Sequence, residues 1–185
     1  LIDTVNGHFD LASILLDRGA DPNVVSDAGA APLYAAINLE WGPKSRYAQP
    51  RSHEFQNTMY LEFMESLLKA GANPNARLTK DLWYKWSGRN ALGATPFWRA
   101  SYGTDVAAMR LLVSYGADPS IATVKGPERR SSPRDTVPND GDGGEEPDPS
   151  GLPPVLEGGP STYPVHAASG VGYGENYSEG NVHRH

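Results

Sequence analysis

Three histidines, His166, His183 and His185, are the one group of side chains in this sequence that suggests metal chemistry. Histidine nitrogens bind zinc well, but a site needs three or four ligands that the fold brings together. His183 and His185 are two residues apart, which does not place them on one face of a helix, and the chain contains no cysteine. We therefore predict no metal site.

Other patterns that could carry catalysis are incomplete. The serines at 13, 66 and 114 lack the Gly-x-Ser-x-Gly context of an activated nucleophile. The glycine-rich residues 170–174 have neither a preceding strand nor the lysine of a phosphate-binding loop. Residues 140–144 look like part of a calcium loop but lack its closing glutamate. We predict no catalytic residue and no cofactor, and that the protein is not an enzyme.

One phrase of five residues occurs three times, at 19–23, 71–75 and 116–120, and reads Gly-Ala-Asp/Asn-Pro-Asn/Ser. Apolar residues three and four apart precede each copy, as in Leu61, Met64 and Leu68, so each copy is predicted to end an amphipathic helix. The glycine closes the helix because it enters the left-handed region without a Cβ clash. The proline then prevents the helix from resuming. The sequence predicts helices around 11–18, 61–69 and 106–115.

A second phrase starts further helices at 31–36, 95–100 and 163–168, each with proline in second place. Proline suits the first helical position, where no amide donor is needed. Thr95 is a good N-cap, whereas Ala31 and Tyr163 cap poorly, at a cost of about 1 kcal/mol each.

Together these phrases resemble the ankyrin repeat, in which a turn leads into a Thr-Pro-Leu-His helix, a second helix and Gly-Ala-Asp-Val-Asn. Thr95 to Gly116 is 21 positions and Gly19 to Ala31 is 12, which together give the ankyrin period of 33. The resemblance implies an all-α helix-turn-helix solenoid of about three repeats plus a partial fourth. It also implies that His166 ties a turn together by hydrogen bonds.

Insertions interrupt this spacing and set the expected domain organisation. Residues 1–123 are predicted to form the repeat array, with a truncated first repeat and insertions near 39–58 and 78–90. Residues 124–161 are rich in Pro, Gly and acid; from Pro127 to Pro160 eight acidic residues against three arginines give −5 of the chain's −6. Such a segment cannot offset its ordering entropy and is predicted to be disordered. Residues 162–185 are predicted to begin a further, incomplete repeat.

An aromatic group is the candidate contact patch: Trp83, Tyr84, Trp86, Arg89 and Trp98. Aromatic residues and arginine are enriched at interface hot spots because they bury much area at little entropic cost. The resemblance places the second insertion near the turns that border the surface used for partners. The alternative is that these aromatic residues pin the insertion onto the neighbouring repeat.

The leading functional hypothesis is a non-catalytic protein–protein interaction scaffold that binds a protein partner as a monomeric array. A first alternative is a targeting or regulatory segment of a larger enzyme, transporter or redox protein whose working domain lies elsewhere. A second is carbohydrate binding through exposed tryptophans. Nucleic acid is disfavoured because the net charge is −6 and the basic residues are scattered. No apolar run reaches the roughly 20 residues of a membrane helix, and the compartment stays open.

Overall fold

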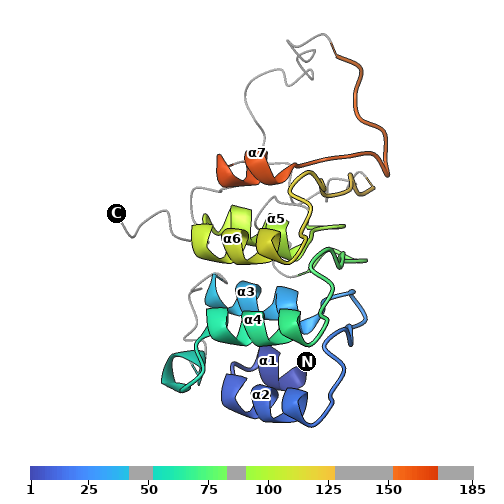
Figure 1. Cartoon of the computed structure of the whole chain (residues 1–185). Helices are drawn as coiled ribbons and strands as arrows, with labels where there is room; N and C mark the ends of the chain where they lie inside the picture. The colour runs from blue at the N-terminus through green and yellow to red at the C-terminus, as the bar shows by residue number, and fades with distance from the viewer. Residues whose placement is uncertain (42–51, 83–90, 128–151, 171–185) are drawn as a thin grey trace, which may run out of the picture.

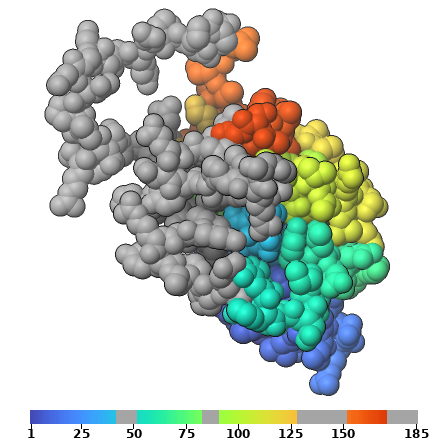
Figure 2. All heavy atoms as spheres, turned by 90° about the vertical axis from the view of Figure 1, so that its left-hand side faces the viewer, coloured from blue at the N-terminus to red at the C-terminus, as the bar shows by residue number. Residues whose placement is uncertain are grey.

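Two layers of short helices build the protein. The computed structural model describes residues 1–41, 52–82, 91–127 and 152–170. The inner layer consists of α1 (Ile2–Val5), α3 (Pro32–Glu40), α5 (Pro96–Tyr102) and α7 (Pro164–Ala168), and the outer layer of α2 (Phe9–Asp17), α4 (Tyr60–Lys69) and α6 (Val106–Ser114). Each outer helix packs on the inner helix before it, and each layer stacks in chain order (Figure 1). Figure 2 shows this stacking as successive colour bands.

This arrangement is an all-α solenoid of helix-turn-helix units of the ankyrin type, as predicted. Across the described residues there is no β-strand, and one isolated bridge joins Val124 and Pro160. The three helices expected before the Gly-Ala turns are α2, α4 and α6, and those expected after proline are α3, α5 and α7. A 3-10 helix, η1 (Ser52–Phe55), precedes α4.

The core lies between the layers and continues from one repeat to the next. Phe9 of α2 stacks on Phe63 of α4 with ring centroids 5.1 Å apart, and both are buried. Leu67 and Leu112 lie in the same apolar cluster, which runs through all three outer helices. The fold therefore holds its repeats together through contacts between neighbours rather than through one central core.

Glycine ends the outer helices for a conformational reason alone. Gly19, Gly71 and Gly116 have φ of 90°, 92° and 85°, in the left-handed region. A Cβ added at any of them would meet no atom within 4 Å, so space does not select glycine there. The positive φ does, because side chains make that region costly.

Asparagine side chains join the turns of successive repeats. Asn23 donates from Nδ2 to the Gly71 carbonyl (2.9 Å) and accepts at Oδ1 from the Asn73 amide (2.8 Å). Asn75 repeats both contacts one unit later, with the Gly116 carbonyl (3.0 Å) and the Asp118 amide (2.8 Å). The third copy of the phrase has Ser120 instead, whose hydroxyl donates to Asp118 of its own turn. The sequence indicates these turns, but the link that their last residue makes between repeats is seen only in the structure.

Replacing Asn75 with alanine is expected to lower the free energy of unfolding by about 1–2 kcal/mol, because both inter-repeat hydrogen bonds are lost. Urea denaturation followed by circular dichroism measures the change. Ser120→Ala is the matched control and is expected to cost less than half as much, since Ser120 bonds only within its own turn. Equal costs for the two substitutions would contradict the linking role of Asn75.

The side chain of Asp10 holds the segment that immediately precedes α4. The carboxylate of Asp10, in the first turn of α2, accepts from the amides of Asn57 (3.0 Å) and Thr58 (2.8 Å) and from the Asn57 side chain (3.0 Å). The amide of Asp10 in turn donates to Gln56 (3.3 Å). The backbone hydrogen bonds from Asn57 and Thr58, in that order, lower the pKa of Asp10 from 3.8 to about 2.

Acid should weaken the hydrogen bonds that the Asp10 carboxylate accepts. Because the folded pKa of Asp10 lies below its unfolded value, its contribution is present above about pH 4 and is lost as pH falls toward 2. The urea midpoint of the wild type should therefore fall further than that of Asp10→Asn between about pH 6 and about pH 2.5. Asp27 and Asp118, whose pKa values are also lowered, are common to both proteins and cancel in the comparison. If the urea midpoints of the wild type and Asp10→Asn fall by the same amount, this role of Asp10 is contradicted.

Candidate protein-interaction surface

Three turns project sideways from the helix stack as fingers (Figure 1). Their described residues are 20–31 in the first finger, 72–82 and 91–95 in the second, and 117–127 and 152–163 in the third. Backbone hydrogen bonds close each finger at its base. Ser26 donates to the Ala30 carbonyl (3.0 Å) in the first, Leu78 to Ala94 (3.0 Å) in the second, and Thr123 to Thr162 (3.0 Å) in the third. The second and third fingers thus contain long loops but keep the short base of the first.

Neighbouring fingers are bonded directly to one another. The Thr79 amide donates to the Ala28 carbonyl (2.9 Å), and the Val124 amide donates to the Leu92 carbonyl (2.7 Å). Gly29 allows this close approach, because a Cβ there would lie 2.8 Å from the Thr79 nitrogen. These bonds make the three fingers one continuous edge.

The side chain of Arg77 reinforces this edge. Its Nε donates to the Gly93 carbonyl (3.0 Å) within the second finger, and its Nη2 donates to the Ala122 carbonyl (2.8 Å) of the third. One guanidinium group therefore spans two fingers, which fixes their separation.

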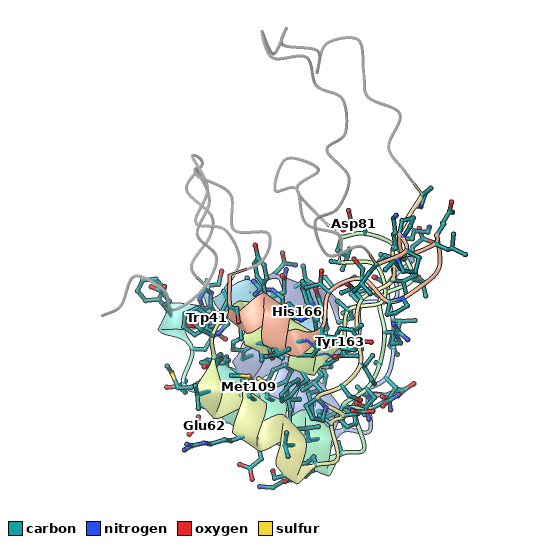
Figure 3. All side chains as sticks on the ribbon, turned by 90° about the horizontal axis from the view of Figure 1, so that it is seen from above. Trp41, Glu62, Asp81, Met109, Tyr163 and His166 are labelled. Atoms are coloured by element: carbon teal, nitrogen blue, oxygen red, sulfur yellow. The ribbon has the colours of Figure 1, made fainter. Side chains whose placement is uncertain are left out.

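Two of the insertions leave the scaffold at the tips of adjacent fingers. Residues 83–90 lie outside the described residues, but Asp81 accepts from the Ala91 amide (3.0 Å) and so closes the base of that segment. Residues 128–151 also lie outside them. Their described flanks are joined, since Lys125 bonds through its backbone to Gly158 (2.9 Å) and Gly159 (2.8 Å). Viewed along the stack, Asp81 lies at the finger side of the molecule (Figure 3).

Hydrogen bonds join the two described ends of residues 124–161. Residues 124–127 bond to residues 152–161, with an isolated bridge between Val124 and Pro160. The Lys125 ammonium also donates to the Val155 carbonyl (2.8 Å). The disorder predicted for residues 124–161 stays a prediction for residues 128–151, which lie outside the described residues.

The first two fingers carry exposed charged and apolar side chains: a charged pair beyond the closing bonds, and two valines just before the bond that closes the first finger. Lys80 pairs with Asp27 across the two fingers, and its hydrogen bond lowers the pKa of the Asp27 carboxyl. Val24 and Val25, on the first finger, are 48% and 53% exposed. We call these four residues the fingertip surface. Exposed valines beside charges on a rigid edge can contact a protein partner.

Of the predicted contact patch, Trp83, Tyr84, Trp86 and Arg89 lie outside the described residues. Trp98 is described and is 2% exposed. Its ring stacks on Tyr102 with centroids 5.4 Å apart, and its Nε1 donates to the Thr162 carbonyl (2.9 Å). Trp98 therefore joins α5 to the base of the third finger and offers no free surface.

A buried polar junction, which no sequence pattern predicted, is centred on Asp105, whose side chain is 3% exposed. Its Oδ1 caps α6 by accepting from the Ala108 amide (3.0 Å). Its Oδ2 accepts from Trp41 Nε1 (2.7 Å) and from the Tyr60 hydroxyl (2.8 Å). One carboxylate thus joins the end of α3 to the starts of α4 and α6. The cap could have been predicted from an aspartate before a helix, but its partners lie too far away in sequence.

Buried Arg99 fixes the same junction from the inner layer. Its Nε donates to Asn38 Oδ1 (2.8 Å) and its Nη2 to the Trp41 carbonyl (2.6 Å). Trp41 is therefore held at both its indole and its backbone. These groups are engaged in binding helices together, so the arrangement is structural and presents no reacting group.

The histidines show no ligand geometry where they are described. His166 is exposed, and its ring stands edge-on to Tyr163 at 5.7 Å instead of tying the turn by a hydrogen bond. His183 and His185 lie outside the described residues. Within the described ranges no three His, Asp or Glu side chains are grouped to hold a metal ion.

None of the helices described is long and apolar enough to cross a bilayer.

The helix pairs, the positive-φ glycine stops and the bonded fingers define a repeat protein with an ankyrin-like fold. No family model matches this chain, and no curated protein matches it either. Among solved structures, the chain is similar to the human ASB11 ankyrin repeat domain, with 18% sequence identity and a TM-score of 0.42. That similarity covers 64% of this chain and 39% of the other, so this chain spans about two fifths of that structure.

Replacing Asp105 with alanine should destabilise the protein by about 3 kcal/mol, because the helix cap is lost and two buried donors lose their acceptor. Asp105→Asn keeps an oxygen for the cap and should cost about 1–2 kcal/mol. Tyr60→Phe, which removes a single donor, serves as the control at about 1 kcal/mol. Urea unfolding measures all three. If Asp105→Ala costs no more than Tyr60→Phe, then Asp105 is not the centre of the junction.

Proposed function

We propose that this protein is a non-catalytic scaffold for protein–protein interaction. The observation that carries the proposal is the continuous finger edge, in which Thr79 bonds to Ala28 and Val124 bonds to Leu92. A rigid edge holds side chains at fixed separations, so little order has to be gained on binding. The fingertip surface and the two insertions that leave beside it form the partner-contact region.

The residues that face the interior support a structural role for the helices. Every residue of α5 is buried, and the polar ones among them are engaged, with Arg99 bonded to Asn38 and Ser101 bonded to the Phe97 carbonyl (2.9 Å). Partner choice in such an array belongs to variable surface positions rather than to the packed framework. The contact patch of Trp83, Tyr84, Trp86 and Arg89 is retained in this proposal as the aromatic part of the partner-contact region.

The two alternative functions differ in how far the described residues support them. A targeting or regulatory segment of a larger protein would use the same finger edge, so it differs only in what accompanies the scaffold. Carbohydrate binding through tryptophan gains no support: two of the four tryptophans are described, and Trp41 and Trp98 are 6% and 2% exposed.

Replacing Trp83 and Trp86 together with alanine should reduce partner capture at least tenfold, equivalent to about 1.4 kcal/mol of binding free energy. The melting temperature should change by less than about 2 °C, because one or two lost surface contacts cost little stability. The measurement is affinity capture by the immobilised full chain, with bound proteins quantified by mass spectrometry.

The matched control is Ile14→Ala, on α2 in the outer layer, where the side chain is 50% exposed. It should leave capture unchanged. A fall of several degrees in melting temperature with unchanged capture would show that the two tryptophans pin the insertion onto the array. The interface role of the patch would then be lost.

A further inference from the structure

The described residues contain the inner helix of the fourth repeat but no outer helix. α7 fills the inner-layer position after α5: Ala167 is fully buried in the cluster that contains Trp98 and Tyr102. In the first three repeats an outer helix packs beside the inner one, as α6 packs beside α5. No described helix takes that place beside α7. Viewed along the stack, α7 lies over the inner layer, with Met109 of α6 beside it (Figure 3).

Apolar side chains line the place beside α7 that no described helix occupies. Val106 and Val113 on α6 and Val165 on α7 are 53%, 50% and 65% exposed. Met109, between the two valines of α6, is partly buried. We call these four residues the α6–α7 slot.

The glycine stops give the register that identifies the slot. Val106 lies ten residues before Gly116, as Phe9 lies ten before Gly19, and Phe9 is fully buried against α4. Val113 lies three residues before Gly116, as Leu68 lies three before Gly71, and Leu68 is 5% exposed. These positions are thus the ones that each outer helix turns toward the next outer helix.

The same register accounts for Val165. It follows the helix-starting Pro164, as Leu33 follows Pro32 and Phe97 follows Pro96. Leu33 and Phe97 are 0% and 8% exposed, and both belong to the cluster between the layers. Val165 therefore stands where the partner of an inner helix should cover it.

The opposite face of each outer helix shows which side chains a helix bound in the slot must present to α6. Phe63 and Leu67 of α4, eight and four residues before the glycine stop, are 1% and 2% exposed. Ala108 and Leu112 hold the same positions in α6 and are fully buried. An outer helix thus contacts the preceding one through two apolar residues four apart.

We propose that the α6–α7 slot binds a single amphipathic α-helix of a partner protein, which completes the fourth repeat as its outer helix. The inference deepens the proposed interaction function by adding a second surface and naming the kind of partner. It rests on continuity with the α2–α4 and α4–α6 interfaces, which the slot would extend by one step. The partner helix presents apolar residues four apart toward α6 and further apolar residues toward Val165.

Two other occupants fit less well. A second copy of this chain would bring its α2, but α1 immediately precedes α2 and would take the inner-layer place that α7 fills. Residues 171–185 of the same chain contain Gly172, Gly174 and Gly180, and each glycine costs a helix about 1 kcal/mol. A helix brought by a partner meets neither obstacle.

The test uses residues 58–72 of this chain as a fluorescent peptide probe, because α4 carries the required pair Phe63 and Leu67. Glu65 and Lys69, already 2.9 Å apart on α4, are joined through a side-chain lactam to hold the peptide helical. Fluorescence anisotropy with the full chain should show saturable binding. The control peptide, with Phe63→Asp and Leu67→Asp, should not bind.

Two variants of the full chain locate the probe. Val113→Lys places a charge in the slot and should weaken binding at least tenfold. Leu15→Lys is the matched control, since Leu15 is 42% exposed on α2 at the other end of the outer layer. It should leave the affinity unchanged. Both side chains are exposed, so both variants should keep the wild-type circular dichroism spectrum.

Four outcomes would overturn the proposal: no saturable binding, equal affinity for the wild type and Val113→Lys, self-association of the chain that Val113→Lys abolishes, or tighter probe binding once residues 171–185 are removed. The last two would assign the slot to a second copy or to the chain's own end. None of them bears on the finger edge, because Trp83 and Trp86 test that surface separately.

Discussion

Each helix pair in this protein has apolar side chains on two opposite faces, and the fold follows from the need to cover both. Phe63 and Leu67 meet the helix pair before them, while Leu68 meets the one after. A single pair cannot hide both faces, so burial requires neighbours in a fixed register. Glycine stops with positive φ set that register, and the asparagine bonds between turns maintain it. Helix packing and turn chemistry therefore specify the same spacing.

The insertions are tolerated because they leave at places where this register is already secured. The first insertion rejoins the array at Asn57 and Thr58, whose backbone amides donate to the Asp10 carboxylate. The second is closed by the bond from Ala91 to Asp81, and the third by the pairing of Lys125 with Gly159. A long loop adds little closure entropy when its ends are fixed in this way. The stack consequently keeps the same geometry on both sides of each insertion.

Local signals predicted the repeating part of the fold and little of the polar chemistry between repeats. The Gly-Ala turns and the Pro-led phrases placed six of the seven described α-helices, because capping and apolar spacing act over a few residues. The junction at Asp105 depends on Trp41, 64 residues away, so only the folded stack brings its partners together. Trp98 was predicted to be a contact residue because aromatic character alone does not distinguish interface from core. Its burial depends on how α7 and the third finger pack against α5, which the sequence pattern does not show.

The serine that ends the third turn has a consequence for how the protein opens. Ser120 bonds back to Asp118, and no side chain of residues 116–120 is hydrogen-bonded to the described residues 152–170. The joined ends of residues 124–161 and α7 are held instead by the backbone bonds between Thr123 and Thr162 and by the Trp98 indole. Packing of α7 on α5, which buries Ala167, adds to these bonds. Among the described residues, 152–170 pack on the array from one side only, so we expect them to open at lower free energy than the helices inside the stack. In native-state hydrogen exchange, amides of residues 152–170 would lose protection at lower free energy than those of α4, so these residues would open while the rest of the stack stays folded.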